Sequence, residues 1–113
     1  MMMLFRWQTG RQKTGYQKML LATLSWPIKF DVYVLKFCTG HEIPPHTDEV
    51  EEGRHFRLNV VLKHPKKGGV FHCEDVIFET RSIKLFRPDI TEHSVSRIEQ
   101  GERYVLSLGW LRR

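Results

Sequence analysis

From Lys29 to the C-terminus the sequence is a succession of short segments with strand character, each ended by turn residues. Residues 31–38 (DVYVLKFC) alternate most clearly, with Tyr33, Leu35 and Phe37 on one side. Such alternation indicates a half-buried strand, and strands about ten residues apart with no helix between them are typical of an antiparallel sandwich or barrel. The sequence therefore predicts a mainly β domain. Further segments of this kind are residues 56–63, 69–73, 76–79, 82–86, 92–98 and 103–110.

The length of the chain restricts which β architecture it can adopt. Its 113 residues suffice for one modest core, so we expect a single domain over residues 1–113. A double-sheet jelly roll, or double-stranded β-helix, removes most exposed strand edges and fits within about 80–100 residues. We therefore predict a barrel of this kind over residues 31–110.

The segment before the barrel has a different period. Residues 14–25 (TGYQKMLLATLS) place apolar side chains at helical spacing, and Pro27 closes the segment. This pattern predicts one short amphipathic helix packed on the barrel. The apolar residues concerned are Tyr16, Met19, Leu20 and Leu24.

Positive charge is concentrated in residues 1–30. This N-terminal arm has five Lys or Arg and no acid, whereas the rest of the chain has 13 basic and 13 acidic residues. A basic arm can favour a nucleic acid, an acidic peptide or an anionic metabolite, and a solvated segment is the simpler interpretation. No basic stripe with interleaved aromatic residues is present to indicate a nucleic-acid module.

Several classes of protein are excluded by composition. No apolar run approaches the roughly 20 residues of a membrane span, and MMMLFRW is too short for the core of a secretion signal. Two cysteines, Cys38 and Cys73, do not form a disulfide framework. The sequence predicts a reduced, cytoplasmic protein without a membrane partner.

The stretch GHEIPPHTD ends in two side chains that can bind a metal, His46 and Asp48. Residues two apart lie on the same side of a strand, so both can point to one ion. His-x-Asp occurs often by chance, and a third ligand is needed before it indicates a metal site.

The C-terminal half offers that third ligand. In HSVSRIEQGERYVLSL, His93 stands near the start of one strand and Arg103 near the start of the next, and the turn at Gly101 predicts that these strands are antiparallel neighbours. Two histidines and one carboxylate on one face of a metal leave adjacent positions open, an arrangement suited to Fe(II). A deeper arginine would suit the far end of a dicarboxylate that chelates the metal.

The ordered set His46-x-Asp48, His93 and Arg103 resembles the 2-oxoglutarate/Fe(II)-dependent oxygenases, in particular their compact prolyl-4-hydroxylase-like branch. The resemblance covers about residues 31–110. It implies that His46, Asp48 and His93 bind Fe(II), and that Arg103 pairs with the distal carboxylate of 2-oxoglutarate. It further implies that dioxygen and 2-oxoglutarate are consumed, that succinate and carbon dioxide are released, and that an organic substrate is hydroxylated or oxidatively demethylated.

Two positions depart from the pattern of that branch. A tyrosine often stands nine residues before the first histidine, where this chain has Phe37, which cannot donate a hydrogen bond. Tyr33 has the same strand parity and could replace it, or be a core aromatic. Some relatives have Arg-x-Ser on the last strand, whereas here Ser107 follows Arg103 by four residues. Ser107 shares the face of Arg103 and is a candidate pocket residue.

One further strand carries polar residues. In residues 56–63, Arg57 and Asn59 alternate with apolar residues, so they point outward if the apolar face forms the core, or line the mouth if the barrel is small. We take Asn59 as a candidate contact to the cosubstrate.

Two other functions fit the same residues. One is a cupin-type metal-dependent isomerase or dioxygenase that does not use 2-oxoglutarate, on the same cupin-like barrel; Arg103 would then lose its purpose. The other is a non-catalytic binding module. The substrate is not specified by the sequence: an open mouth suits a peptide or a nucleic acid, and a homodimer closing over a small metabolite is the alternative.

Overall fold

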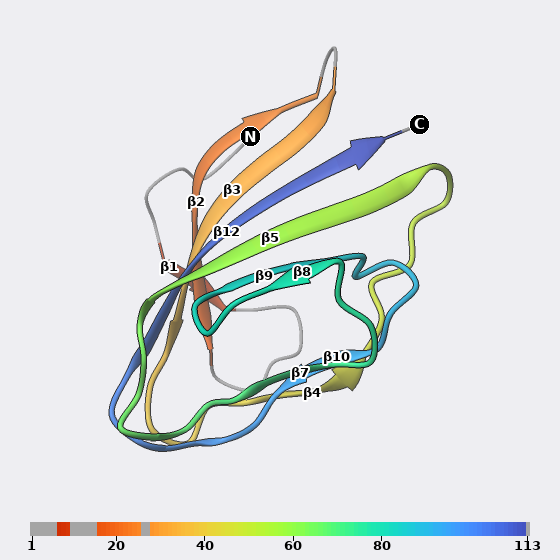
Figure 1. Cartoon of the computed structure of the whole chain (residues 1–113). Helices are drawn as coiled ribbons and strands as arrows, with labels where there is room; N and C mark the ends of the chain where they lie inside the picture. The colour runs from red at the N-terminus through yellow and green to blue at the C-terminus, as the bar shows by residue number, and fades with distance from the viewer. Residues whose placement is uncertain (1–6, 10–15, 26–27, 113) are drawn as a thin grey trace.

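The computed structural model describes residues 7–9, 16–25 and 28–112, and these residues form strands and connecting turns only. Seven strands form one long sheet in the order β1-β2-β3-β12-β5-β9-β8, and a shorter sheet, β4-β10-β7, lies below it in Figure 1. The prediction of a mainly β domain is confirmed. In chain order the strands are β1 (Trp7–Thr9), β2 (Gln17–Leu24), β3 (Lys29–Phe37), β4 (Ile43–His46), β5 (Arg54–Lys63), β6 (Lys67–Gly68), β7 (Phe71–Cys73), β8 (Phe78–Glu79), β9 (Ile83–Phe86), β10 (His93–Val95), β11 (Ile98–Gln100) and β12 (Arg103–Arg112).

The centre of the long sheet is β12, which pairs antiparallel with β3 on one side and β5 on the other. Its residues alternate strictly between buried and half-buried positions from Arg103 to Trp110, as expected for a central strand with one face turned to the interior. The inner face therefore carries Arg103, Val105, Ser107 and Gly109.

The register of the three central strands arranges the inner face in rows. One row joins Arg57, Gly109 and Asp31 across β5, β12 and β3. The next two rows are polar and then apolar, and the last pairs Arg103 with Phe37. The polar row is Asn59, Ser107 and Tyr33, and the apolar row is Val61, Val105 and Leu35.

The hydrophobic core lies at the Phe37 end of this face. Phe37, Ile98 and Val105 have no exposed surface, and the ring of Tyr16 stacks on Phe37 with 5.1 Å between centroids. The core thus closes one end of the space between the two sheets, and the polar rows remain to line what is left.

The helix expected over residues 14–25 is wrong for the part that the structure describes, because Gln17–Leu24 is strand β2 and pairs with β3. Tyr16 and Leu20 are the buried residues of this segment. A spacing of four fits both a helix and alternate positions of a strand, and Lys18 between them concealed the alternation. A helix of this length is marginal without tertiary contacts, so pairing with a long neighbour decides the outcome.

A second expectation is also wrong. The strands that contain His93 and Arg103 are not neighbours, because β10 pairs with β4 and β7 whereas β12 pairs with β3 and β5. Between them β11 pairs with β6, and Gly101, at φ 96°, turns the chain into β12. His93 and Arg103 therefore lie on different sheets.

Three of the five basic residues of the predicted N-terminal arm, Arg6, Arg11 and Lys13, lie outside the described residues. Within the described part of the chain, no helix has the length and apolar character that crossing a membrane requires.

Candidate metal and anion site

Strands β4 and β10 bring the two candidate histidines together. His46 ends β4, His93 begins β10, and the two are direct partners in the register of the short sheet. β4 contains Pro44 and Pro45, which cannot donate ladder hydrogen bonds, and accordingly it is an edge strand. Asp48 follows two residues after His46, and its backbone N–H donates to the carbonyl of Pro88 at 2.6 Å.

Local hydrogen bonds orient both imidazole rings. His46 Nδ1 lies 2.8 Å from the carbonyl oxygen of Pro44, and His93 Nδ1 lies 2.9 Å from that of Thr91. A carbonyl oxygen only accepts, so each Nδ1 carries the hydrogen and each neutral ring has its lone pair on Nε2. This is the tautomer in which a histidine binds a metal through Nε2 while its other nitrogen is held by the protein.

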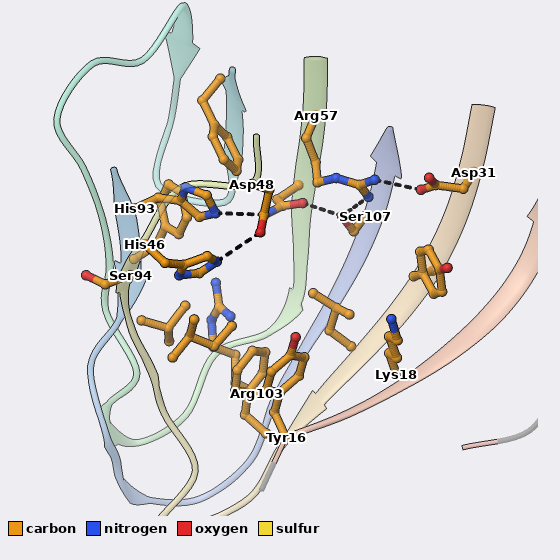
Figure 2. Close-up of a pocket in the computed structure, with 18 of the residues that line it drawn as sticks. Tyr16, Lys18, Asp31, His46, Asp48, Arg57, His93, Ser94, Arg103 and Ser107 are labelled. Atoms are coloured by element: carbon orange, nitrogen blue, oxygen red, sulfur yellow. Dashed lines mark hydrogen bonds and ion pairs between the residues drawn. The ribbon is translucent and has the colours of Figure 1, made fainter. Parts of the chain in front are cut away.

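The three side chains converge on one point. His46 Nε2 lies 3.5 Å from Asp48 Oδ1, and His93 Nε2 lies 3.4 Å from Asp48 Oδ2 (Figure 2). One ligand atom from each of the three residues lies within 4.8 Å of the other two. Both N···O separations exceed the roughly 2.7–3.2 Å of good hydrogen bonds, and the spacing suits donors around a common ion. The donor set, two imidazoles and one carboxylate, fits a divalent transition metal.

The loop before His93 is locked in place. Arg87 Nη2 donates to Asp89 Oδ2 at 2.6 Å, and the side chain of Asp89 is almost fully buried. Burial alone would raise the pKa of Asp89, but hydrogen bonds from Arg87 and from backbone N–H groups outweigh it and lower that pKa. Thr91 N–H donates to the carbonyl of Arg87, which fixes the residue whose own carbonyl holds His93.

A pocket of about 250 Å³ lies between the sheets and contains the three candidate ligands. Phe71 and Phe86 form an apolar wall beside His93, with the Phe86 ring centroid 5.1 Å from the imidazole. The floor is the inner face of the long sheet. Sequence-predicted residues that line this pocket are His46, Asp48, His93, Arg103, Tyr33, Asn59, Ser107 and Arg57.

Arg103 is the most unusual member of the floor. Its residue is only 3 % exposed, and among the described residues no carboxylate forms an ion pair with it. Its guanidinium lies over the ring of Phe37, 4.9 Å from the centroid. Burial lowers its pKa to about 10, which still leaves the group cationic at neutral pH. Figure 2 shows it in the pocket, beyond His46 and toward Tyr16.

Other predicted residues occupy the floor with partners of their own. Ser107 Oγ donates to Asn59 Oδ1 at 2.6 Å, and both residues are buried. The ammonium group of Lys18 lies over the ring of Tyr33, 5.1 Å from the ring centroid. Burial, together with the nearby charge of Asp31, raises the pKa of the Tyr33 hydroxyl.

Sequence reasoning missed several pocket residues, among them Asp31, Tyr16, Lys18 and His55. Asp31 shares the strand parity of Tyr33, so its position was available from the pattern. Tyr16 and Lys18 were missed because their segment was interpreted as a helix, and His55 because it had no evident partner set.

Comparison with known proteins places this geometry in context. No protein-family model matches the chain, and no curated protein sequence matches it. Among solved structures, a predicted oxalate decarboxylase from Thermotoga maritima superposes with a TM-score of 0.61 at 17% identity, covering 85% of this chain and 80% of that one. KdgF from Halomonas sp. gives a TM-score of 0.57 at 25% identity, covering 96% of this chain and 87% of that one. The cupin domain of Cnp3 from Schizosaccharomyces pombe gives 0.56 at 15% identity, covering 87% and 61%.

The fold is cupin-like. The prediction of a jelly-roll barrel holds at this level, whereas the narrower resemblance to 2-oxoglutarate-dependent oxygenases has no counterpart among these neighbours. In this cupin-like chain the candidate metal ligands come from the short sheet and the loop after β4, and the cationic floor comes from the long sheet.

Proposed function

We propose that this chain is a cupin-type metal-dependent enzyme that acts on a small organic anion. His46, Asp48 and His93 hold a divalent metal ion, and Arg103 binds a carboxylate of the substrate or cosubstrate in the same pocket. The cupin-like neighbours support the metal-dependent part, and one of them is described as a predicted oxalate decarboxylase, an enzyme named for a dicarboxylate.

The observation that carries the proposal is the burial of Arg103 without an acidic partner in the described part of the chain. A buried cation costs stability unless it is paired, and the ring of Phe37 offsets only part of that cost. A guanidinium matches a carboxylate with two parallel hydrogen bonds. Its position in the pocket that also contains the candidate ligands therefore favours an anion that spans Arg103 and the metal.

The charges of the pocket favour the same ligand. Arg57 is already paired with Asp31 at 2.7 Å, so these two charges offset each other. Arg103 and a divalent ion together exceed the single negative charge of Asp48. A pocket with surplus positive charge and an apolar wall, here Phe71 and Phe86, attracts anions and binds them more strongly than open solvent allows.

The protein residues have definable tasks in this site. The carbonyl groups of Pro44 and Thr91 keep both Nε2 atoms directed at the ion. Phe71 and Phe86 keep water from one side of it. The ion itself, when bound, would polarise a coordinated oxygen group of the substrate or, if it is iron, activate dioxygen.

A second candidate is the 2-oxoglutarate-dependent oxygenase. The observation that favours it is the composition of the site: one carboxylate in the order His-x-Asp, a distant histidine, and an arginine ten residues later in the same pocket. In this version the anion is 2-oxoglutarate, which together with dioxygen and the organic substrate yields succinate, carbon dioxide and the oxidised substrate. Phe37 cannot supply the hydrogen bond of the family tyrosine, and Tyr33 is the floor residue that could.

The test measures metal binding, anion binding and turnover in turn. Co(II) or Fe(II) is titrated anaerobically, and oxalate, succinate and 2-oxoglutarate are then titrated into the loaded protein. The expected result is metal-dependent anion binding that Arg103→Met abolishes while metal affinity stays within about threefold; Arg81→Met, at an exposed position, is the control.

Release of succinate from 2-oxoglutarate with Fe(II) and dioxygen would select the second candidate over the first. A chain that binds no divalent metal would overturn both.

A further inference from the structure

A chain of side-chain hydrogen bonds crosses the floor of the pocket. Asp31 Oδ1 accepts from Arg57 Nη2 at 2.7 Å, and Arg57 Nη1 donates to Ser107 Oγ at 2.8 Å. Ser107 Oγ then donates to Asn59 Oδ1 at 2.6 Å. Figure 2 shows Arg57 reaching from its own strand to Ser107 and Asp31. The four residues come from three strands, so the chain depends on the register of the long sheet.

The direction of the two bonds from Arg57 follows from chemistry. A guanidinium only donates, so Asp31 Oδ1 and Ser107 Oγ must accept from Arg57. The single hydrogen of the Ser107 hydroxyl is then free for Asn59 Oδ1, 2.6 Å away. With Oδ1 facing Ser107, the Nδ2 hydrogens of Asn59 point away from Ser107.

A glycine makes room for this arrangement. Gly109 lies between Arg57 and Asp31 in the register, and a Cβ at Gly109 would overlap Nη2 and Cζ of Arg57. Any side chain there would push the guanidinium away from the row. The absence of a side chain at Gly109 thus allows the Arg57 guanidinium to take the position in which the Asp31 carboxylate holds it.

Asn59 is the last residue of this series of hydrogen bonds, and it faces the pocket. It is 8 % exposed and lines the same cavity as the candidate metal ligands, and within the described ranges Nδ2 has no hydrogen-bond acceptor. Ser107 and Arg103 are four residues apart on β12, which is roughly 13 Å along a strand. In the view of Figure 2 they approach the His46–Asp48–His93 group from different directions.

We infer that Asn59 Nδ2 is a substrate-binding donor, held in position by Asp31, Arg57 and Ser107. This inference rests on the proposed function and narrows the substrate class: an organic acid with a carboxylate for Arg103 and a second oxygen acceptor, a carbonyl, hydroxyl or carboxylate, for Asn59. Ser107 is a positioning residue rather than a ligand, because its hydrogen and the lone pair facing Arg57 are both used within the protein.

Asn59→Asp is the decisive variant. An aspartate has the same shape and still accepts from Ser107, but it presents an oxygen where the amide presents N–H groups. Co(II) binding is monitored through the visible absorption bands of the ion, and the affinity of Asn59→Asp for Co(II) should lie within about threefold of the wild-type value. Oxalate and 2-oxoglutarate should bind the Co(II)-loaded variant about 30-fold more weakly or worse, since a bond to a charged group is replaced by repulsion. Neutral imidazole, as a ligand for the open metal positions, should bind as before.

Gln100→Glu is the matched control, because it makes the same amide-to-acid change at an exposed residue of β11.

A second pair of variants tests the positioning role. Ser107→Ala should weaken anion binding about fivefold in the wild-type background and not at all in the Asn59→Asp background, since a residue that acts only through Asn59 has nothing left to position. Gly109→Ala should behave like Ser107→Ala. If Asn59→Asp does not fold, Asn59→Ala takes its place in both measurements.

The outcomes separate this inference from the proposed function. Anion binding that depends on Arg103 but is unchanged in Asn59→Asp overturns the inference alone. Weakening of Co(II) binding as large as that of anion binding also overturns it, because Asn59 would then serve the metal ligand Asp48. A wild-type protein that binds Co(II) but neither acid overturns both the inference and the anion part of the proposed function.

Discussion

The two walls of the pocket hold their functional side chains in different ways. On the short sheet, His46 and His93 are each oriented by a backbone carbonyl two residues earlier in the chain. On the long sheet, Arg57 is oriented by partners 26 and 50 residues away. The two imidazoles of the metal wall, the side of the pocket formed by His46, Asp48 and His93, are therefore oriented by local geometry. The anion floor, the inner face of the long sheet, is arranged only when three long strands are in register. A substitution in the metal wall should therefore affect only its immediate neighbours. A substitution in the anion floor should also displace the other residues of the same row.

The largest effect is expected from the metal wall itself. His93→Ala removes one of three ligands and should lower the affinity for Co(II) by about a thousandfold or more, since each ligand contributes several kcal/mol to a bound ion. Isothermal titration calorimetry on the metal-free protein measures this. His72→Ala, an exposed histidine on the neighbouring strand β7, is the control and should bind as the wild type does. Equal loss in both variants, or in neither, would contradict the assignment of the site.

The next largest effect distinguishes function from stability on the floor. Arg103→Met replaces a buried cation, which has no ion-pair partner among the residues that the structure describes, with an apolar side chain of similar length. Anion affinity should fall by about a hundredfold or more, while the free energy of unfolding of the metal-free protein rises by about 1–3 kcal/mol. Urea denaturation at neutral pH gives the second quantity. A destabilised Arg103→Met protein would mean that the guanidinium serves the fold, and the case for an anion would lose its main support.

The difference between the walls also explains how far the sequence could be interpreted. His46, Asp48 and His93 were predicted from a short motif and one distant histidine, and the structure brings their ligand atoms within 4.8 Å of one another. Their orientation is local, so a local pattern carries the signal. The parity of β3 and β12 likewise predicted that Tyr33 and Ser107 would share a face with the functional residues.

What the sequence left out depends on pairing between distant strands. Nothing in residues 14–25 marks β2 as a strand until β3 lies beside it. For that reason Lys18 was not predicted to line the pocket. The pairing of β10 with β4 rather than with β12 is equally non-local, because it depends on whether β10 joins the short sheet or the long sheet. The link between Asp31 and Asn59 needs the register of three strands, and no spacing within one segment encodes it.

A moderate effect is expected where the metal wall depends on its loop. Asp89→Asn weakens the bidentate pair with Arg87 that fixes the Thr91 carbonyl, and thus the ring of His93. Co(II) affinity should fall about tenfold, in the range usual for groups that orient metal ligands, with a stability loss of about 1–3 kcal/mol. The same titration measures the affinity. Asp75→Asn, at an exposed position, is the control, and an unchanged affinity in Asp89→Asn would mean that the His93 ring is held without the loop.

The smallest effect concerns the border between the two walls, where His55 lies beside Arg57. His55 Nε2 is 3.4 Å from Arg57 Nη2, and a guanidinium only donates, so this contact is available to the neutral ring alone. Burial, followed by the charge of Arg57, lowers the pKa of His55 below 6.5, although Asp31, Asp89 and Asp48 act in the opposite direction. As pH falls below 6.5, the unfolded chain takes up a proton at this position before the folded protein does, and stability is lost.

His55→Gln removes that difference in proton uptake. Between pH 7.5 and pH 5.5, the free energy of unfolding of the metal-free wild type should therefore fall more steeply than that of His55→Gln, as measured by urea denaturation across the series. His72→Gln, at an exposed position, should keep the wild-type slope. Identical slopes in all three proteins would mean that burial and Arg57 do not hold His55 neutral in the folded protein.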